Sequence, residues 1–266
     1  MTVMKIYVCI KHVPDSAVQI TLTAKNRIDE RVTFLMNPYD EHAVEEAVRL
    51  KERITGCEVI AVTLGKEGAV TTLQSALAMG ADRGVFIKTD DPPDAILTAK
   101  LLAAAISQDG LPDIIFTGKE SIDSQGMQTA FRIGAALDMP VAVNAAALSL
   151  DWVVNRASDQ NRMLAECEKD GGDRDVIEMH LPCVISAGKS LNLPRYPTLP
   201  QIMKARKKKI EQIDAGSLGI EKPLAGMEIL KLQVATYKRK KRILDGSPEQ
   251  AVSRLIQCLH EEEKVF

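Results

Sequence analysis

The fold is decided by "KIYVCIK" (residues 5–11), "DEHAVEEAVRLKERI" (residues 40–54) and "EVIAVTLG" (residues 58–65). The first and third are short apolar runs typical of buried strands, and the second has the apolar spacing of an amphipathic helix. The same alternation continues in "EGAVTTLQSALAMGA", "RGVFIK", "AILTAKLLAAAISQ", "DIIFT" and "QTAFRIGAAL". Strands and helices that alternate in this way form right-handed β-α-β units. We therefore predict an α/β fold: a parallel sheet with helices on both faces.

Composition and charge narrow the class of protein. The 266 residues are 45% hydrophobic and 26% charged, which is typical of a globular protein with one large core. With a net charge of -2, the sequence lacks the excess of basic residues that nucleic-acid binding usually needs. The N-terminal sequence enters a strand pattern directly, without a signal-peptide profile or an apolar run of membrane-span length. We expect a cytoplasmic protein without direct membrane insertion.

The residues that commonly carry catalysis are scattered. The five cysteines form no CxxC pair and no metal-ligand spacing, and Cys183 is expected in the core rather than as a nucleophile. The four histidines show no pairing with a serine or cysteine nucleophile. The sequence therefore predicts no autonomous active site.

A loop rich in glycine, hydroxyls and amides, "GKESIDSQGMQTAFRIG" (residues 118–134), follows the predicted strand "DIIFT". Backbone N–H groups and hydroxyls here can approach a phosphate at the start of the next helix. The residues concerned are Gly118, Ser121, Ser124, Gly126, Gln128 and Thr129. The loop matches neither the P-loop nor the dinucleotide fingerprint, so a phosphate site and an ordinary connecting loop both remain open.

The segment "MNPYD" (residues 36–40) marks the start of the first predicted helix. Asn and Pro favour a turn. We expect Asp40 to cap the helix, and we expect the positive end of the helix dipole to stabilise the negative charge of Glu41. Helix N-termini at the carboxyl edge of a sheet favour anions.

The second half of the chain departs from the alternation. Two antiparallel strands are predicted around the turn "KDGGD" (residues 169–173). From Gly188 onward we expect no extension of the sheet but an extended arm with a terminal helix, which needs a partner chain to lie against. This divides the chain into an α/β domain (1–190), a recognition loop with a basic helix (191–210) and a C-terminal arm that packs on the partner (211–266).

Three prolines stiffen the segment "LPRYPTLPQIMKARKKKI" (residues 193–210). It is expected to be an exposed loop that presents Tyr196, Leu199, Ile202 and Met203. A stiff loop loses little conformational entropy on docking. A proline-rich domain linker is the alternative.

Several stretches together resemble the electron transfer flavoprotein β-subunit family. They are "VCIKHVPDS", "MNPYDEHAVEEAVRLKE", "ALAMGADRG", "TGKESIDSQGMQT" and "LPRYPTLPQIMKARKKKI", in order over residues 4–220. The resemblance implies a heterodimer in which the α subunit holds a redox FAD. The β subunit would contribute a Rossmann-like sheet that binds AMP and an arm that wraps the partner.

The resemblance also assigns roles to residues. The phosphate loop would contact AMP through Ser121, Ile122, Asp123, Ser124, Gln125, Gln128 and Thr129, with Gly118 and Gly126 in the same loop. The adenosine would lie against the Cys9 backbone and Leu64, beside Asn37, Pro38, Tyr39 and Asp40. Leu199 would anchor an acyl-CoA dehydrogenase, flanked by Tyr196, Thr198, Pro200, Ile202 and Met203.

Two features of this sequence bear on the cofactor and the function. Ser16 stands where some members place an aromatic residue near the flavin, and "IDSQGMQTAF" (residues 122–131) lacks the "IDGDTAQVGP" pattern of bifurcating members. We therefore expect AMP, with a second FAD in its place as the alternative. The expected function is electron transfer from dehydrogenases, through the α-subunit FAD, to a quinone oxidoreductase or another acceptor. The alternatives are an electron-bifurcating flavoprotein that oxidises NADH and, in a different class, a stand-alone nucleotide-binding protein.

Overall fold

The computed structural model describes residues 3–23, 28–90, 93–151, 161–220, 230–234 and 241–265. They fall into two compact units. One unit takes its described residues from 1–20 and 29–230, and the other takes them from 21–28 and 231–266.

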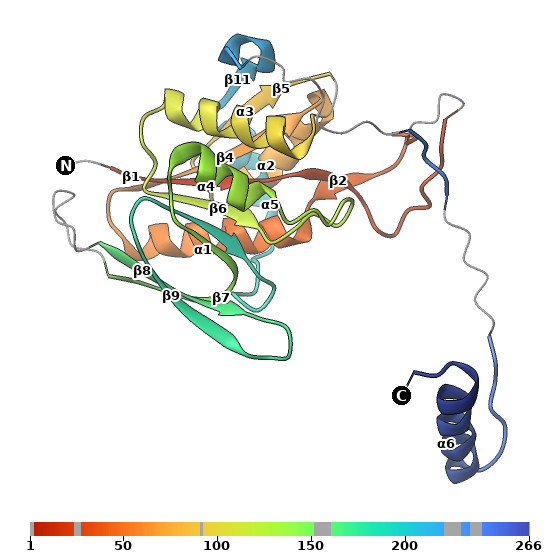
Figure 1. Ribbon diagram of the computed structural model, residues 1–266. Helices are drawn as coiled ribbons and strands as arrows, with labels where there is room; N and C mark the ends of the chain where they lie inside the picture. The colour runs from red at the N-terminus through yellow and green to blue at the C-terminus, as the bar shows by residue number, and fades with distance from the viewer. Residues whose placement is uncertain are drawn as a thin grey trace. The chain divides into compact units, whose positions relative to one another are not determined.

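The first unit is built on a nine-stranded sheet with the order β11-β5-β4-β1-β6-β10-β7-β8-β9 (Figure 1). The strands are β1 (Met4–Cys9), β4 (Cys57–Gly65), β5 (Arg83–Lys88), β6 (Ile114–Gly118), β7 (Val141–Asp151), β8 (Arg162–Glu168), β9 (Arg174–His180), β10 (Cys183–Ala187) and β11 (Ile210–Asp214). Neighbours from β11 to β7 pair in parallel, whereas β7, β8 and β9 pair antiparallel. A short antiparallel pair, β2 (His12–Pro14) and β3 (Phe34–Met36), follows β1.

Helices cover both faces of this sheet. The helices are α1 (Pro38–Arg53), α2 (Val70–Met79), α3 (Ala95–Gln108), α4 (Thr129–Leu137) and α5 (Leu199–Ala205), with short 3₁₀ turns η1 (Glu67–Ala69) and η2 (Ala215–Leu218). Apolar residues of α1 and α2 share one core cluster with alternate side chains of β1 such as Ile6 and Val8. Residues of α3 and α4 share the other cluster with Tyr7 and Cys9. The predicted α/β fold, a Rossmann-like sheet with helices on both faces, is confirmed.

The antiparallel hairpin is also where the sequence predicts it. Strands β8 and β9 pair from Arg162 with His180 to Glu168 with Arg174. The turn between them is closed by the Lys169 N–H, which donates to the Asp173 carbonyl at 2.9 Å. Gly171 and Gly172 both have positive φ, a conformation that glycine adopts without the cost other residues incur.

The expectation that nothing after Gly188 extends the sheet is wrong. Strand β11 pairs in parallel with β5 from Ile210 with Gly84 to Asp214 with Lys88. As an edge strand it exposes most of its residues, so its sequence "IEQID" carries too few apolar residues to signal a strand. The basic stretch before it returns the chain to the sheet.

The second unit contains the predicted terminal helix, α6 (Pro248–Gln257), continued by the turn η3 (Cys258–Glu262). Ser247 and Gln250 form a capping box at its start. The arm predicted over 211–266 lies partly outside the described residues, at 221–229, 235–240 and 266. Among the helices that the structure describes, none is long and apolar enough to cross a membrane.

Candidate functional site

The order in which the chain adds strands to the sheet reverses at β1. From β1 the chain goes through α1 to β4 on one side, continues to β5, and then crosses back to β6 on the other side of β1. In open parallel sheets, ligands bind beyond the carboxyl ends of the strands at such a switch point. Cys9 ends β1 and Gly118 ends β6, so the predicted site residues from both strands lie at this edge.

Asp40 ties the two strand ends to α1. Its buried carboxylate accepts hydrogen bonds from the Lys11 N–H at 2.7 Å and from the Gly118 N–H at 3.0 Å. A Cβ atom on Gly118 would stand 2.3 Å from Asp40 Oδ1 and 2.9 Å from the Tyr39 carbonyl carbon. Glycine is therefore required at 118 because the first turn of α1 lies against it.

The predicted capping role of Asp40 is wrong. Helix α1 begins at Pro38, two residues earlier than the expected cap, and Asn37 occupies the N-cap position. Proline at the first helical position is favoured because its missing N–H needs no partner there. Asp40 thus lies inside the first turn, where its carboxylate can reach across to the sheet.

The environment of Asp40 changes its acidity. Burial raises the pKa of its carboxyl to about 7, although the N–H donors of Lys11 and Gly118 and the Asn37 side chain oppose this. Burial and the nearby Asp40 also raise the pKa of the Cys9 thiol to about 12. Cys9 is therefore a neutral thiol at the end of β1, with no nucleophilic character at neutral pH.

Asn37 holds the predicted phosphate loop against α1. Its Nδ2 donates to the Glu120 carbonyl at 2.8 Å, and its Oδ1 accepts from the Ile122 N–H at 3.2 Å. The side chain is buried, with 1% of the residue exposed. An amide group supplies both a donor and an acceptor, so Asn37 fixes the loop at two points, Glu120 and Ile122.

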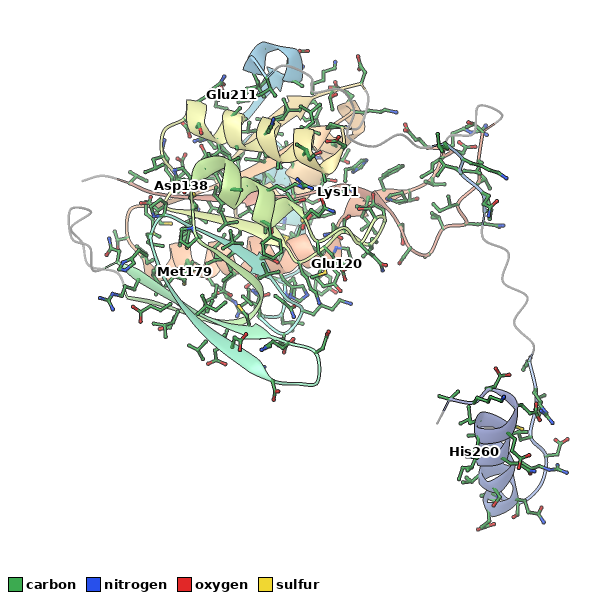
Figure 2. The ribbon with its side chains drawn as sticks, viewed as in Figure 1. Lys11, Glu120, Asp138, Met179, Glu211 and His260 are labelled. Carbon is green, nitrogen blue, oxygen red and sulfur yellow. The ribbon has the colours of Figure 1, made fainter. Side chains whose placement is uncertain are left out.

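Lys11 is a site residue that the sequence reasoning missed. Its Nζ atom donates to Asp123 Oδ1 at 2.7 Å and to Ser121 Oγ at 3.2 Å, and it lies 3.5 Å from Ser124 Oγ. Figure 2 labels Lys11 and Glu120 near this end of the sheet. A lysine placed just beyond a buried strand, at the carboxyl edge, is the signal that could have identified it.

The end of the loop leads into α4. Gln128 is its N-cap residue, and no side chain among the described residues caps the first turn. The Gln128 side chain instead accepts from Arg132 Nε at 2.9 Å. Gln125 and Met127 both have positive φ, and a Cβ on Gly126 between them would meet nothing within 4 Å.

These features fit a phosphate. An uncapped helix start offers backbone N–H donors and the positive end of a dipole, and Gly126 leaves open space before it. Ser121 and Ser124 add hydroxyls whose oxygens lie 2.8 Å apart. Lys11 adds a cation beside both hydroxyls. Together these groups form a donor set of the kind that can bind a phosphate group.

The remaining predicted nucleotide residues lie along the same edge. Leu64 is near the end of β4, the other neighbour of β1, and packs against the cluster that contains Cys9. Tyr39 follows Pro38 in the first turn of α1, and the Lys189 ammonium lies 5.1 Å from its ring centroid. Burial and Glu120 raise the pKa of the Tyr39 hydroxyl.

The predicted recognition residues are exposed, as expected. Tyr196 is 94% exposed and Leu199 72%, and Ile202 and Met203 also face solvent. However, the segment is not a loop throughout, because α5 begins at Leu199 with Thr198 and Gln201 as a capping box. Arg195 joins the segment to α1 through Glu45 at 2.7 Å and Glu52 at 2.6 Å.

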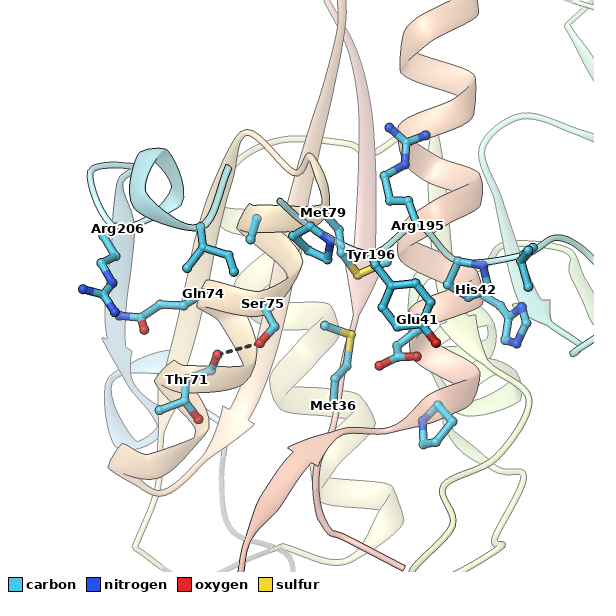
Figure 3. Close-up of a pocket in the computed structure, with 16 residues that line it drawn as sticks. Met36, Glu41, His42, Thr71, Gln74, Ser75, Met79, Arg195, Tyr196 and Arg206 are labelled. Carbon is cyan, nitrogen blue, oxygen red and sulfur yellow. Dashed lines mark hydrogen bonds between the residues drawn. The ribbon is translucent and has the colours of Figure 1, made fainter. Parts of the chain in front are cut away.

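A cavity of about 570 Å³ lies between this segment, α1 and α2 (Figure 3). Its lining includes Met36, Glu41, Gln74, Met79 and Tyr196. It is on the sheet face that α1 and α2 cover, and of the predicted nucleotide residues it includes Pro38 alone. The cavity therefore belongs to the surroundings of the recognition segment.

Metal binding and a role for Cys183 as a nucleophile are the two other kinds of site considered among the described residues. No group of three or more His, Cys, Asp or Glu residues there is arranged to hold a metal ion. The cysteines are free, and Cys183 is fully buried as predicted. Burial raises the pKa of the Cys183 thiol to about 12, so it is a core residue.

Comparison with known proteins finds similarity to electron transfer flavoproteins. Residues 26–218 match the model of the electron transfer flavoprotein domain. The electron transfer flavoprotein subunit beta of Bacillus subtilis is 32% identical over 269 residues, which cover 99% of this chain and 100% of the relative. The mitochondrial subunit of Arabidopsis thaliana is 36% identical, covering 95% and 97%. The human subunit is 38% identical, covering 83% and 85%.

Proposed function

The chain belongs to the electron transfer flavoprotein family as a β subunit, and from this premise we propose that it holds AMP and carries electrons in a heterodimer with an α subunit. The observation that supports AMP is the donor set at the switch point of the sheet. The uncapped start of α4 and the open space at Gly126 belong to one loop, and the Lys11 ammonium, which follows β1, bonds to Asp123 of that loop. A phosphate monoester matches these groups in charge and size.

The adenosine part would lie on the sheet edge next to this loop. Cys9 ends β1 opposite Val62 of β4, and Leu64, two residues further along β4, packs against the apolar cluster that contains Cys9. An apolar surface of this kind suits a purine ring. Tyr39 and Pro38 stand at the first turn of α1, which packs against Gly118. This arrangement would place the nucleotide along the sheet edge, from the phosphate loop across β1 to β4.

In the proposed complex, the FAD of the α subunit supplies the redox chemistry. This chain contributes the α/β unit, the rigid AMP site and surfaces for partners. The proposed donor is an acyl-CoA dehydrogenase, and the proposed acceptor is a quinone oxidoreductase.

Leu199 is the proposed anchor for the dehydrogenase. It is 72% exposed at the first position of α5, next to the exposed Tyr196. Pro197 and Pro200 flank it, and Arg195 fixes the preceding backbone to α1. A rigid apolar side chain of this kind is typical of an interface anchor.

The proposed compartment is the cytoplasm. Its support is the set of five free cysteines, because a reducing compartment keeps dispersed thiols unpaired.

Thermal unfolding of the full-length chain with added nucleotide tests the proposed AMP site. AMP at a hundred times its dissociation constant should stabilise the chain by about 2.7 kcal/mol, since it binds only the folded state. Adenosine and inorganic phosphate, at the same concentration, should each give a smaller shift. Equal melting temperatures with and without AMP would exclude the site.

A further inference from the structure

We propose that Lys11 is the cation that binds the nucleotide phosphate and that Asp123 is its positioning residue rather than a phosphate contact. This inference rests on the proposed AMP site and adds one residue to it. Lys11 lies outside the phosphate loop in sequence, since it follows β1, yet its ammonium reaches three oxygens of that loop.

The backbone of Lys11 is fixed on both sides. Its N–H donates to Asp40 Oδ2 at 2.7 Å, and its carbonyl accepts from the Asn37 N–H at 3.0 Å. The preceding residue, Ile10, is held by β4 because its N–H donates to the Val62 carbonyl at 2.9 Å. The root of the lysine side chain is therefore rigid, and less conformational freedom is lost when the ammonium takes a ligand.

The ammonium itself remains accessible. The Lys11 side chain is 46% exposed, and its Nζ atom lies beside Ser121 Oγ and Ser124 Oγ. A lysine ammonium has three donors and acts on a phosphate as a compact charge. A phosphate that accepts from the two serine hydroxyls would thus stand within reach of Nζ.

Asp123 cannot serve the phosphate through its side chain. Burial raises the pKa of its carboxyl, but the hydrogen bonds from Lys11 and Ser121 outweigh this and leave the pKa below its ordinary value. The carboxylate is therefore ionised at neutral pH, accepts hydrogen bonds only, and repels another anion. Its bond to Nζ at 2.7 Å gives it a different role, which is to hold the ammonium over the loop.

Two neighbouring cations are directed elsewhere. The Arg132 guanidinium donates to Gln128 Oε1, and the Lys189 ammonium lies over the Tyr39 ring. Lys11 is the cation whose contacts fall on Ser121, Asp123 and Ser124, the oxygen-bearing residues at the centre of the loop.

Calorimetric titration of the full-length chain with AMP and, separately, with adenosine tests this assignment. Lys11→Met should weaken AMP binding at least tenfold and leave adenosine binding unchanged, because only AMP carries the phosphate. The matched control is Lys88→Met, which removes the same charge from the end of β5, where Lys88 pairs with Glu67 at 3.2 Å. The control should bind both ligands as the parent chain does.

The role of Asp123 is tested in the same assay by a double-mutant cycle. Asp123→Asn should weaken AMP binding several-fold in the parent chain and have no effect in the Lys11→Met background. An Asp123→Asn effect of equal size in both backgrounds would overturn the positioning role. Equal AMP affinity of Lys11→Met and the parent chain, or equal losses for AMP and adenosine, would overturn the role of Lys11. A parent chain that binds neither AMP nor adenosine would instead refute the proposed function.

Discussion

Asp40 shows how one residue connects local structure to the site. Its carboxylate is buried in the first turn of α1 and bonds the backbone of Lys11 after β1 and of Gly118 at the end of β6. These strands are neighbours at the switch point, so the side chain fixes their spacing. Lys11 and Gly118 in turn lead into the two parts of the proposed phosphate site.

The raised pKa of Asp40 predicts a pH dependence of folding. The folded chain holds the Asp40 proton up to about pH 7, whereas the unfolded chain releases it near 3.8. The contribution to stability is therefore fully present below pH 3.8 and is lost as the pH rises to about 7, by at most about 1.4 kcal/mol per pH unit. Urea unfolding of the nucleotide-free chain and of Asp40→Asn, from pH 5 to pH 8, should give curves that differ in slope below pH 7. Parallel curves would contradict the assignment.

Two glycines of the phosphate loop should respond differently to a methyl group. Gly118→Ala places Cβ against Asp40 and the backbone of Tyr39, which cannot move aside cheaply, so we expect a destabilisation of about 1–3 kcal/mol. Gly126→Ala meets open space and should change stability by less than about 0.5 kcal/mol. Urea unfolding without nucleotide measures both. Equal effects of the two substitutions would show that the contact at Gly118 is not rigid.

At this scale the sequence reveals residue types but not their partners. Polar residues and glycine in 118–134 predict a loop that can hold an anion. The bond between Asp40 and Gly118 joins residues 78 positions apart, and that between Lys11 and Asp123 joins residues 112 apart. Such contacts depend on the strand order, which local patterns do not contain. Asp40 therefore reads as a helix cap, and Lys11 goes unnoticed.

Among the elements, α5 carries the proposed docking surface. Its capping box fixes where the helix begins, and Pro200 suits the first turn, so Leu199 stands at a defined position. The proline spacing predicts the stiffness and exposure of the segment. A basic helix is expected within residues 191–210, but its start at Leu199 is not, because a seven-residue helix has too few turns to produce a clear apolar period.

Replacement of Leu199 by Ala tests this surface. The variant should lower the rate of electron transfer from the dehydrogenase by at least tenfold and leave the flavin content of the heterodimer unchanged, since Leu199 is 72% exposed and belongs to neither core cluster of the described residues. Leu111→Ala is a matched control, because Leu111 is 68% exposed in the connection between α3 and β6. A transfer rate equal to that of the control would remove the recognition role.

For the whole molecule, the alternation of strands and helices was sufficient to predict the parallel sheet and its two covered faces. The buried strands β1, β4 and β6 are nearly continuous apolar runs, which is the pattern of a sheet buried on both sides. Strand β11 escaped prediction because an edge strand needs little apolar sequence.

Within the second unit, α6 exposes Val252, Leu255 and Ile256, an apolar face that agrees with the proposed partner subunit.

We propose that this chain is the AMP-holding β subunit of a single-flavin electron carrier. The most direct test is to co-purify it with its α subunit, denature the complex, and quantify the nucleotides released per heterodimer. The proposed AMP site predicts one FAD and one AMP. Two FAD and no AMP would contradict it and would place a second flavin at the loop that we assign to the AMP phosphate.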